Sequence, residues 1–120
     1  MSSPPKLQSV APIFLVTDMQ RALDYYTRVL GFGIEWAVGE PTTHASVARD
    51  GVEISLTAES APVPSQVYIE VDGVDEYFDR VSANGANVVV PLGDRPYGMR
   101  DGRIDDPDGN SIQLGESLVP

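Results

Sequence analysis

The sequence predicts an α+β fold in which one strand–helix–strand–strand–strand unit occurs twice. An apolar run that ends in aspartate is followed thirteen residues later by glycine at two places, Asp18 to Gly31 and Asp72 to Gly85. Apolar residues recur with helical spacing inside both intervals. The pattern D-G-x-x-I-x-L also occurs twice, beginning at Asp50 and at Asp108. Because such repetition indicates a repeated structural unit, we expect two βαβββ modules.

The first module is expected to cover residues 10–58, after an N-terminal arm over residues 1–9. Its first strand ends before Asp18, a residue type that favours the N-cap of a helix. Gly31 then ends the helix, because glycine accepts the left-handed conformation of a C-cap. The three strands expected after the helix cover residues 32–38, 44–49 and 52–58.

The second module is expected to cover residues 66–115, after a linker over residues 59–65 and before a tail over residues 116–120. Its helix is expected to be capped by Asp72 or Asp75 and to end at Gly85. The strands of this module are expected at residues 67–71, 86–91, 99–105 and 110–115, with a loop at residues 92–98.

Composition narrows the range of partners. Eighteen acidic and eight basic side chains give a formal charge of −10, which repels phosphate backbones and argues against a nucleic-acid partner. The same charge attracts a cationic small molecule, although it can also serve only solubility. The chain contains no cysteine and no apolar run long enough to span a bilayer, so we expect a cytoplasmic protein without a membrane partner.

Few residues carry recognisable catalytic chemistry. His44 is the only histidine, and no motif around any serine supports a triad that uses it. His44 can therefore be a ligand, a base, a pocket residue or an exposed strand residue. Two aromatic residues are stronger candidates for binding: Trp36 lies on a strand next to Glu35, and Tyr97 lies in a loop between proline and glycine.

Two motifs identify a family resemblance. The stretches Y-Y-T-R-V-L-G-F-G at residues 25–33 and D-P-D-G-N at residues 106–110 resemble the vicinal oxygen chelate superfamily, and the resemblance covers residues 10–115. That group includes glyoxalase I, extradiol dioxygenases, and fosfomycin and bleomycin resistance proteins. The resemblance implies that the two modules form a cup-shaped mixed sheet. In metal-using members, four strand positions that converge in this sheet hold the metal. The resemblance places them here at Ala11, Ser55, Gln66 (or Ser65) and Gln113, which are neutral, so we expect no metal and no cofactor.

Within the superfamily the chain resembles the bleomycin resistance proteins most closely, above all in G-D-R-P-Y-G at residues 93–98. This resemblance implies an acidic homodimer whose shared clefts bind a cationic, planar glycopeptide antibiotic without altering it. It also implies that Trp36 and Tyr97 stack on the ligand, where the family usually has tryptophan in place of Tyr97. The other residues expected to bind the ligand are His44, Tyr68, Gln66, Gln113, Glu35 and Asp94.

Two other functions remain open at this stage. One is a metal-dependent enzyme of the same superfamily, such as a glyoxalase or dioxygenase. The other is a protein that binds a different small aromatic metabolite. No catalytic residue is predicted, and the resistance-type function predicts no turnover.

Overall fold

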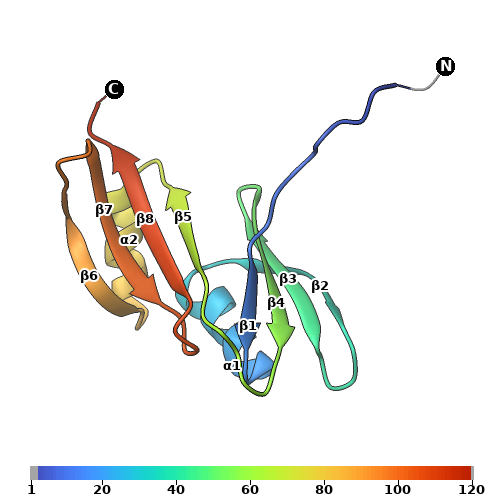
Figure 1. Ribbon diagram of the computed structural model, residues 1–120. Coiled ribbons are helices and arrows are strands. Elements are labelled where there is room, and N and C mark those ends of the chain that lie inside the picture. The colour runs from blue at the N-terminus through green and yellow to red at the C-terminus, as the bar shows by residue number, and fades with distance from the viewer. Residues whose placement is uncertain (1–2, 120) are drawn as a thin grey trace.

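The computed structural model describes residues 3–119, so residues 1–2 of the expected arm and residue 120 of the expected tail lie outside the described residues. The chain folds into two four-stranded mixed sheets with one helical region each (Figure 1). The first module contains β1 (Ile13–Val16), α1 (Met19–Asp24), the π-helical segment η1 (Tyr25–Val29), β2 (Gly33–Val38), β3 (His44–Arg49) and β4 (Val52–Ala58). The second contains β5 (Gln66–Glu70), α2 (Val74–Ala83), β6 (Asn87–Asp94), β7 (Met99–Asp105) and β8 (Ser111–Ser117).

The two sheets have the same topology, which confirms the repeated unit. Their strand orders are β1-β4-β3-β2 and β5-β8-β7-β6. In each sheet the first strand pairs in parallel with the last, and the remaining neighbours are antiparallel. The modules form two separate sheets within the chain, however, where the family resemblance had implied one cup-shaped sheet.

Some expected boundaries are wrong in detail. Strand β6 continues to Asp94, although residues 92–98 were expected to form a loop. The N-cap of α2 is Gly73, and neither Asp72 nor Asp75 caps the helix through its side chain. The Glu116 carboxylate of β8 takes that role, since it accepts hydrogen bonds from the amides of Gly73 at 3.2 Å and Val74 at 3.0 Å. A cap supplied from a distant strand cannot be read from local sequence.

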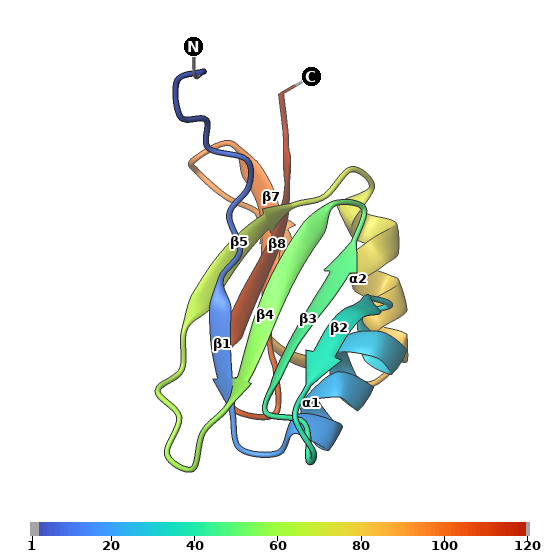
Figure 2. The ribbon, with the colours of Figure 1, turned by 90° about the vertical axis from the view of Figure 1, so that its right-hand side faces the viewer.

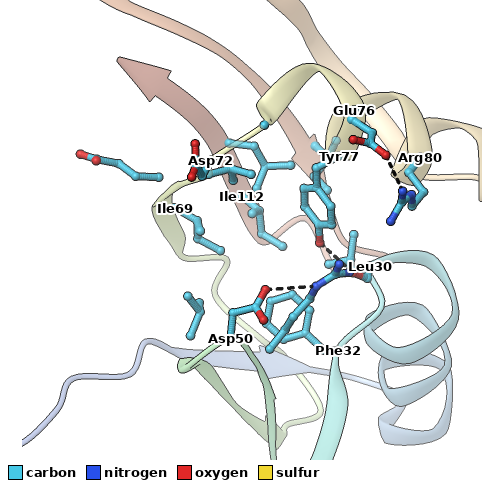
Figure 3. A pocket seen from close by; sticks show the side chains of 16 residues that line it. Leu30, Phe32, Asp50, Ile69, Asp72, Glu76, Tyr77, Arg80 and Ile112 are labelled. Carbon is cyan, nitrogen blue, oxygen red and sulfur yellow. Dashed lines mark hydrogen bonds and ion pairs between the residues drawn. The ribbon is translucent and has the colours of Figure 1, made fainter. Parts of the chain in front are cut away.

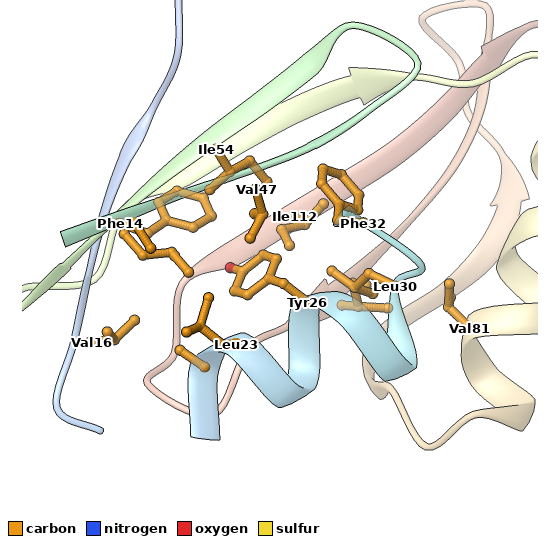
Figure 4. Close-up of a cluster of buried hydrophobic side chains, with 14 of the residues drawn as sticks. Phe14, Val16, Leu23, Tyr26, Leu30, Phe32, Val47, Ile54, Val81 and Ile112 are labelled. Atoms are coloured by element: carbon orange, nitrogen blue, oxygen red, sulfur yellow. The ribbon is translucent and has the colours of Figure 1, made fainter. Parts of the chain in front are cut away.

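The D-G-x-x-I-x-L repeat supplies matching halves of the core (Figure 4). Ile54 and Leu56 of β4, and Ile112 and Leu114 of β8, are all buried at equivalent positions. Tyr26 packs among side chains of both modules, so one continuous hydrophobic core joins the two units. None of the helices within residues 3–119 is long and apolar enough to cross a membrane.

The D-P-D-G-N turn connects the two modules. The buried Asp106 carboxylate accepts hydrogen bonds from the Tyr26 hydroxyl at 2.9 Å and from the backbone amides of Asp108 and Asn110, each at 2.9 Å. The Asn110 side-chain amide also donates to Asp106 at 2.9 Å and to the carbonyl of Leu15 in β1 at 3.1 Å. The D-P-D-G-N motif therefore stabilises the contact between the two modules.

Each sheet leaves one face without helices, and we call these the open faces. Along the strands, buried residues that face the core alternate with more exposed ones, as in an antiparallel sheet covered on one side. Figure 2 looks onto the first sheet and shows the N-terminal arm extending away from β1. The open faces present most of the residues that the sequence predicts for ligand binding.

Candidate functional site

The first open face presents Trp36, whose surface is 49% exposed. Trp36 pairs with Ser46 of β3, and a register shift between Ile34 and Trp36 marks a β-bulge at Glu35. Because a bulge places two residues opposite one, Glu35 also reaches Ser46 and accepts a hydrogen bond from its hydroxyl at 2.7 Å. The bulge thus places a carboxylate directly beside an exposed indole.

His44 lies at the start of β3, two residues before Ser46 and on the same face of the strand. Its Nδ1 atom lies 3.0 Å from the hydroxyl of Thr43, and its backbone pairs with Val38 of β2. His44 therefore borders the surface around Trp36.

The second open face is organised around Asp101, which is only 3% exposed. One of its carboxylate oxygens, Oδ2, accepts hydrogen bonds from the hydroxyls of Tyr68 at 3.0 Å and Tyr97 at 2.7 Å. The other, Oδ1, pairs with Nε of Arg95 at 3.0 Å. Gly115 is required beside this group, because a Cβ atom there would collide with the Tyr68 hydroxyl. Asp101 therefore fixes both phenol rings on one surface.

The pKa values of Asp101, Tyr68 and Tyr97 favour the hydrogen bonds from both phenols to the carboxylate. Burial opposes the charge of Asp101, but the hydrogen bonds from Tyr97, Arg95 and Tyr68 outweigh it and lower the pKa below 3.8. Burial and the bond to Asp101 raise the pKa of Tyr68 to about 12. The pKa of Tyr97 is raised as well, chiefly by its hydrogen bond to Asp101. Both phenols therefore remain protonated donors at neutral pH.

We expect the Asp101→Asn variant to lose about 2 kcal/mol of unfolding free energy at neutral pH, because a charge-assisted bond is lost. Since folding lowers the pKa of Asp101 below 3.8, its charge stabilises the wild type above that pH. This contribution disappears as pH falls through the lowered pKa, so the difference between the two proteins should shrink in acid. Denaturant unfolding at a series of pH values measures it.

Asp94→Asn is the matched control for this prediction. Asp94 lies in the same β-hairpin, its side chain is 63% exposed, and it pairs with Arg100 at 3.0 Å. An exposed ion pair contributes at most about 1 kcal/mol. Equal losses in the two variants would show that Asp101 has no special role.

The remaining predicted residues lie on or near the second open face. Gln113 pairs with Tyr68, and Gln66 pairs with Ser111, so both glutamines alternate onto the side that carries Tyr68. Asp94 lies at the end of β6, where it shares Arg100 with Asp75 of α2. The sequence had suggested Asp94 as a carboxylate that attracts the ligand.

The side chains present do not fit a divalent metal. Ser55 pairs with Ile13, and Ala11 precedes β1 and has no donor atom. Gln66 and Gln113 offer only neutral amides, whereas divalent cations in proteins are held mainly by imidazole, thiolate or carboxylate groups. Within residues 3–119 no group of three or more histidine, cysteine, aspartate or glutamate residues could hold a metal ion.

The chain does not bring its two predicted stacking residues together. Trp36 lies on β2 and Tyr97 follows β6, and these strands are the outer edges of different sheets on opposite sides of the molecule (Figure 1). The sequence suggests Asp101 only as one of several carboxylates near the two aromatic residues, with Glu35, Glu40 and Asp94; it does not predict the hydrogen bonds from both phenols to Asp101 or the ion pair with Arg95. The only signal available was an aspartate four residues after Tyr97 in the expected strand.

Comparison with known proteins defines the class. A family model for the Glyoxalase/Bleomycin resistance protein/Dioxygenase superfamily matches residues 6–114. Because this match covers most of the sequence, the chain belongs to that superfamily.

Particular relatives differ in what they do. Lactoylglutathione lyase of Escherichia coli O157:H7 is 29% identical over 116 residues, which cover 84% of this chain and 86% of the lyase. The crystal structure of TioX from Micromonospora sp. ML1 matches with a TM-score of 0.82 and 28% identity, over 92% of this chain and 99% of that one. The bleomycin-binding protein of Streptomyces verticillus, complexed with copper(II)-bleomycin, matches with a TM-score of 0.77 and 19% identity, over 92% and 97%. At 19% identity, the similarity to the bleomycin-binding protein shows only that the two folds are alike. Membership thus defines an architecture that serves both an enzyme and a binding protein.

Proposed function

We propose that this protein binds and sequesters a cationic, planar antibiotic of the bleomycin type without altering it. The observation that carries the proposal is the exposed indole of Trp36 beside the carboxylate of Glu35. An aromatic face stacks on a flat ring system, and a neighbouring carboxylate attracts a cationic tail. These two contacts together select a ligand that is both planar and positively charged.

The second open face supplies a complementary surface. Tyr97 is 63% exposed and Tyr68 lies next to it on the shared Asp101 carboxylate, while Gln66 and Gln113 offer amide groups nearby. Since Trp36 and Tyr97 lie on opposite sides of one chain, we propose a homodimer in which the first open face of one copy and the second open face of the other enclose the ligand. Symmetric pairing of two copies would produce two such clefts.

The test is a calorimetric titration of the metal-free protein with bleomycin at low and moderate salt. We expect saturable binding with one ligand per subunit, and affinity that falls as salt increases because the acidic surface is screened. The formal charge of −10 makes this salt dependence a specific expectation. Absence of both binding heat and a thermal shift would reject the antibiotic as the ligand.

A metal-dependent lyase is the second candidate, because the lyase of Escherichia coli O157:H7 is 29% identical to this chain. The neutral set of Ala11, Ser55, Gln66 and Gln113 argues against it. Stoichiometric metal in the purified protein, lost together with lyase activity on chelation, would favour this candidate over sequestration.

A further inference from the structure

A cavity of about 440 Å³ lies between the two modules, on the core side of the sheets (Figure 3). Its volume is within the range of small-molecule sites. Phe32 of the first module, and Ile69 and Ile112 of the second, direct their side chains toward its centre. None of the residues that the sequence predicts for antibiotic binding lines this cavity, so it is separate from both open faces.

Hydrogen bonds fix one wall of the cavity. The Tyr77 hydroxyl of α2 donates to the carbonyl of Leu30 at 2.7 Å, across the boundary between modules. Arg49 donates to the same carbonyl at 3.3 Å, and its guanidinium lies 5.0 Å from the centre of the Tyr77 ring. Because these contacts hold both modules at the end of η1, the cavity is formed before any ligand binds.

The charges around the cavity are predominantly negative. Two arginines line it, but each already has an acidic partner in the lining: Arg49 with Asp50 at 3.6 Å, and Arg80 with Glu76 at 2.7 Å. The lining also includes Asp72, which has no cationic partner in any ion pair within residues 3–119, whereas the Glu70 side chain alternates with Ile69 onto the open face that carries Tyr68. The Asp72 carboxylate therefore gives the cavity an excess of negative charge beside its apolar floor.

We propose that this cavity binds a small organic cation with an apolar body, such as an ammonium group carried on an aromatic or branched aliphatic chain. The apolar body covers Phe32, Ile69 and Ile112, and the ammonium group faces Asp72. An anionic ligand of the same shape would be repelled by this carboxylate. The inference does not rest on the proposed antibiotic site, because the two share no residue.

The probe is phenylbutylammonium, compared with the uncharged phenylbutanol and the anionic phenylbutyrate. Titration followed by backbone amide NMR of the full chain should show saturable shifts for the ammonium compound at residues around Ile69 and Ile112. The Trp36 indole signal should not move. We expect phenylbutanol to bind about fivefold more weakly and phenylbutyrate not to bind, because only the cation matches the acidic side of the cavity.

Two variants locate the site. The Asp72→Asn variant should weaken phenylbutylammonium binding about fivefold, whereas Asp79→Asn, an equivalent change at an exposed position of α2, should leave it unchanged. Ile69→Trp should abolish binding by filling the cavity. Absence of saturable binding to the wild type, equal affinity for phenylbutanol, or shifts centred on Trp36 would each overturn the proposal.

Discussion

The Asp106→Ala variant is expected to lose about 3–5 kcal/mol of unfolding free energy. The substitution removes a buried carboxylate and leaves the Tyr26 hydroxyl and the Asn110 amide with lost hydrogen bonds inside the core. Each buried polar group without a partner costs about 1–3 kcal/mol. Chemical denaturation followed by circular dichroism measures the difference from the wild type.

A graded series tests whether the connection between modules explains this loss. Tyr26→Phe removes one hydrogen bond to Asp106 and keeps the ring, so we expect a loss of about 1–2 kcal/mol. Asp79→Asn changes an exposed aspartate and should stay within about 0.5 kcal/mol of the wild type. A small effect of Asp106→Ala, comparable to that of Asp79→Asn, would contradict the assignment of this turn as a structural link.

The repeated unit could be predicted from sequence because its signals are local. A β-turn at Asp50-Gly51 requires two positive φ angles, which the structure has at 52° and 81°. The flanking strands, residues 44–49 and 52–58, were therefore predicted at their observed bounds. Alternation then decided which side chains face the core, as the buried Ile54 and Leu56 show.

The candidate site was harder to predict, because its contacts join residues that are distant in the chain. Simple alternation would place Glu35 and Trp36 on opposite faces, but a bulge brings both to Ser46. Asp101 collects hydrogen bonds from Tyr68 and Tyr97, which lie 33 and 4 residues away. Sequence periodicity contains no information about either arrangement.

The cavity between the modules was missed for a related reason. Tyr77 follows the apolar spacing of α2, a spacing that is typical of core residues. In the structure Tyr77 is half-buried, and its hydroxyl reaches the carbonyl of Leu30 at the end of η1. Helical periodicity gives the direction of a side chain but not the packing distance between two modules, and that distance determines whether the space is filled.

Replacement of Trp36 by alanine is expected to weaken bleomycin binding about 30-fold, or about 2 kcal/mol, which is the cost typical of losing a central aromatic contact. Unfolding free energy should change little, because the indole is half exposed on the outer strand β2. Calorimetric titration of the folded variant measures the affinity. The Trp36→Phe variant keeps an aromatic face of smaller area and should lie between the alanine variant and the wild type.

Val38→Ala is the matched control for this prediction, because Val38 lies two residues further along β2 and is similarly exposed. The change removes apolar surface from the same strand without removing an aromatic face. If stacking determines affinity, Val38→Ala should lose less than about threefold, since only two methyl groups are removed from a partly exposed position. An unchanged affinity in Trp36→Ala, or an equal loss in both variants, would mean that the ligand binds without stacking on the indole, and the acidic charge would then be its main attraction.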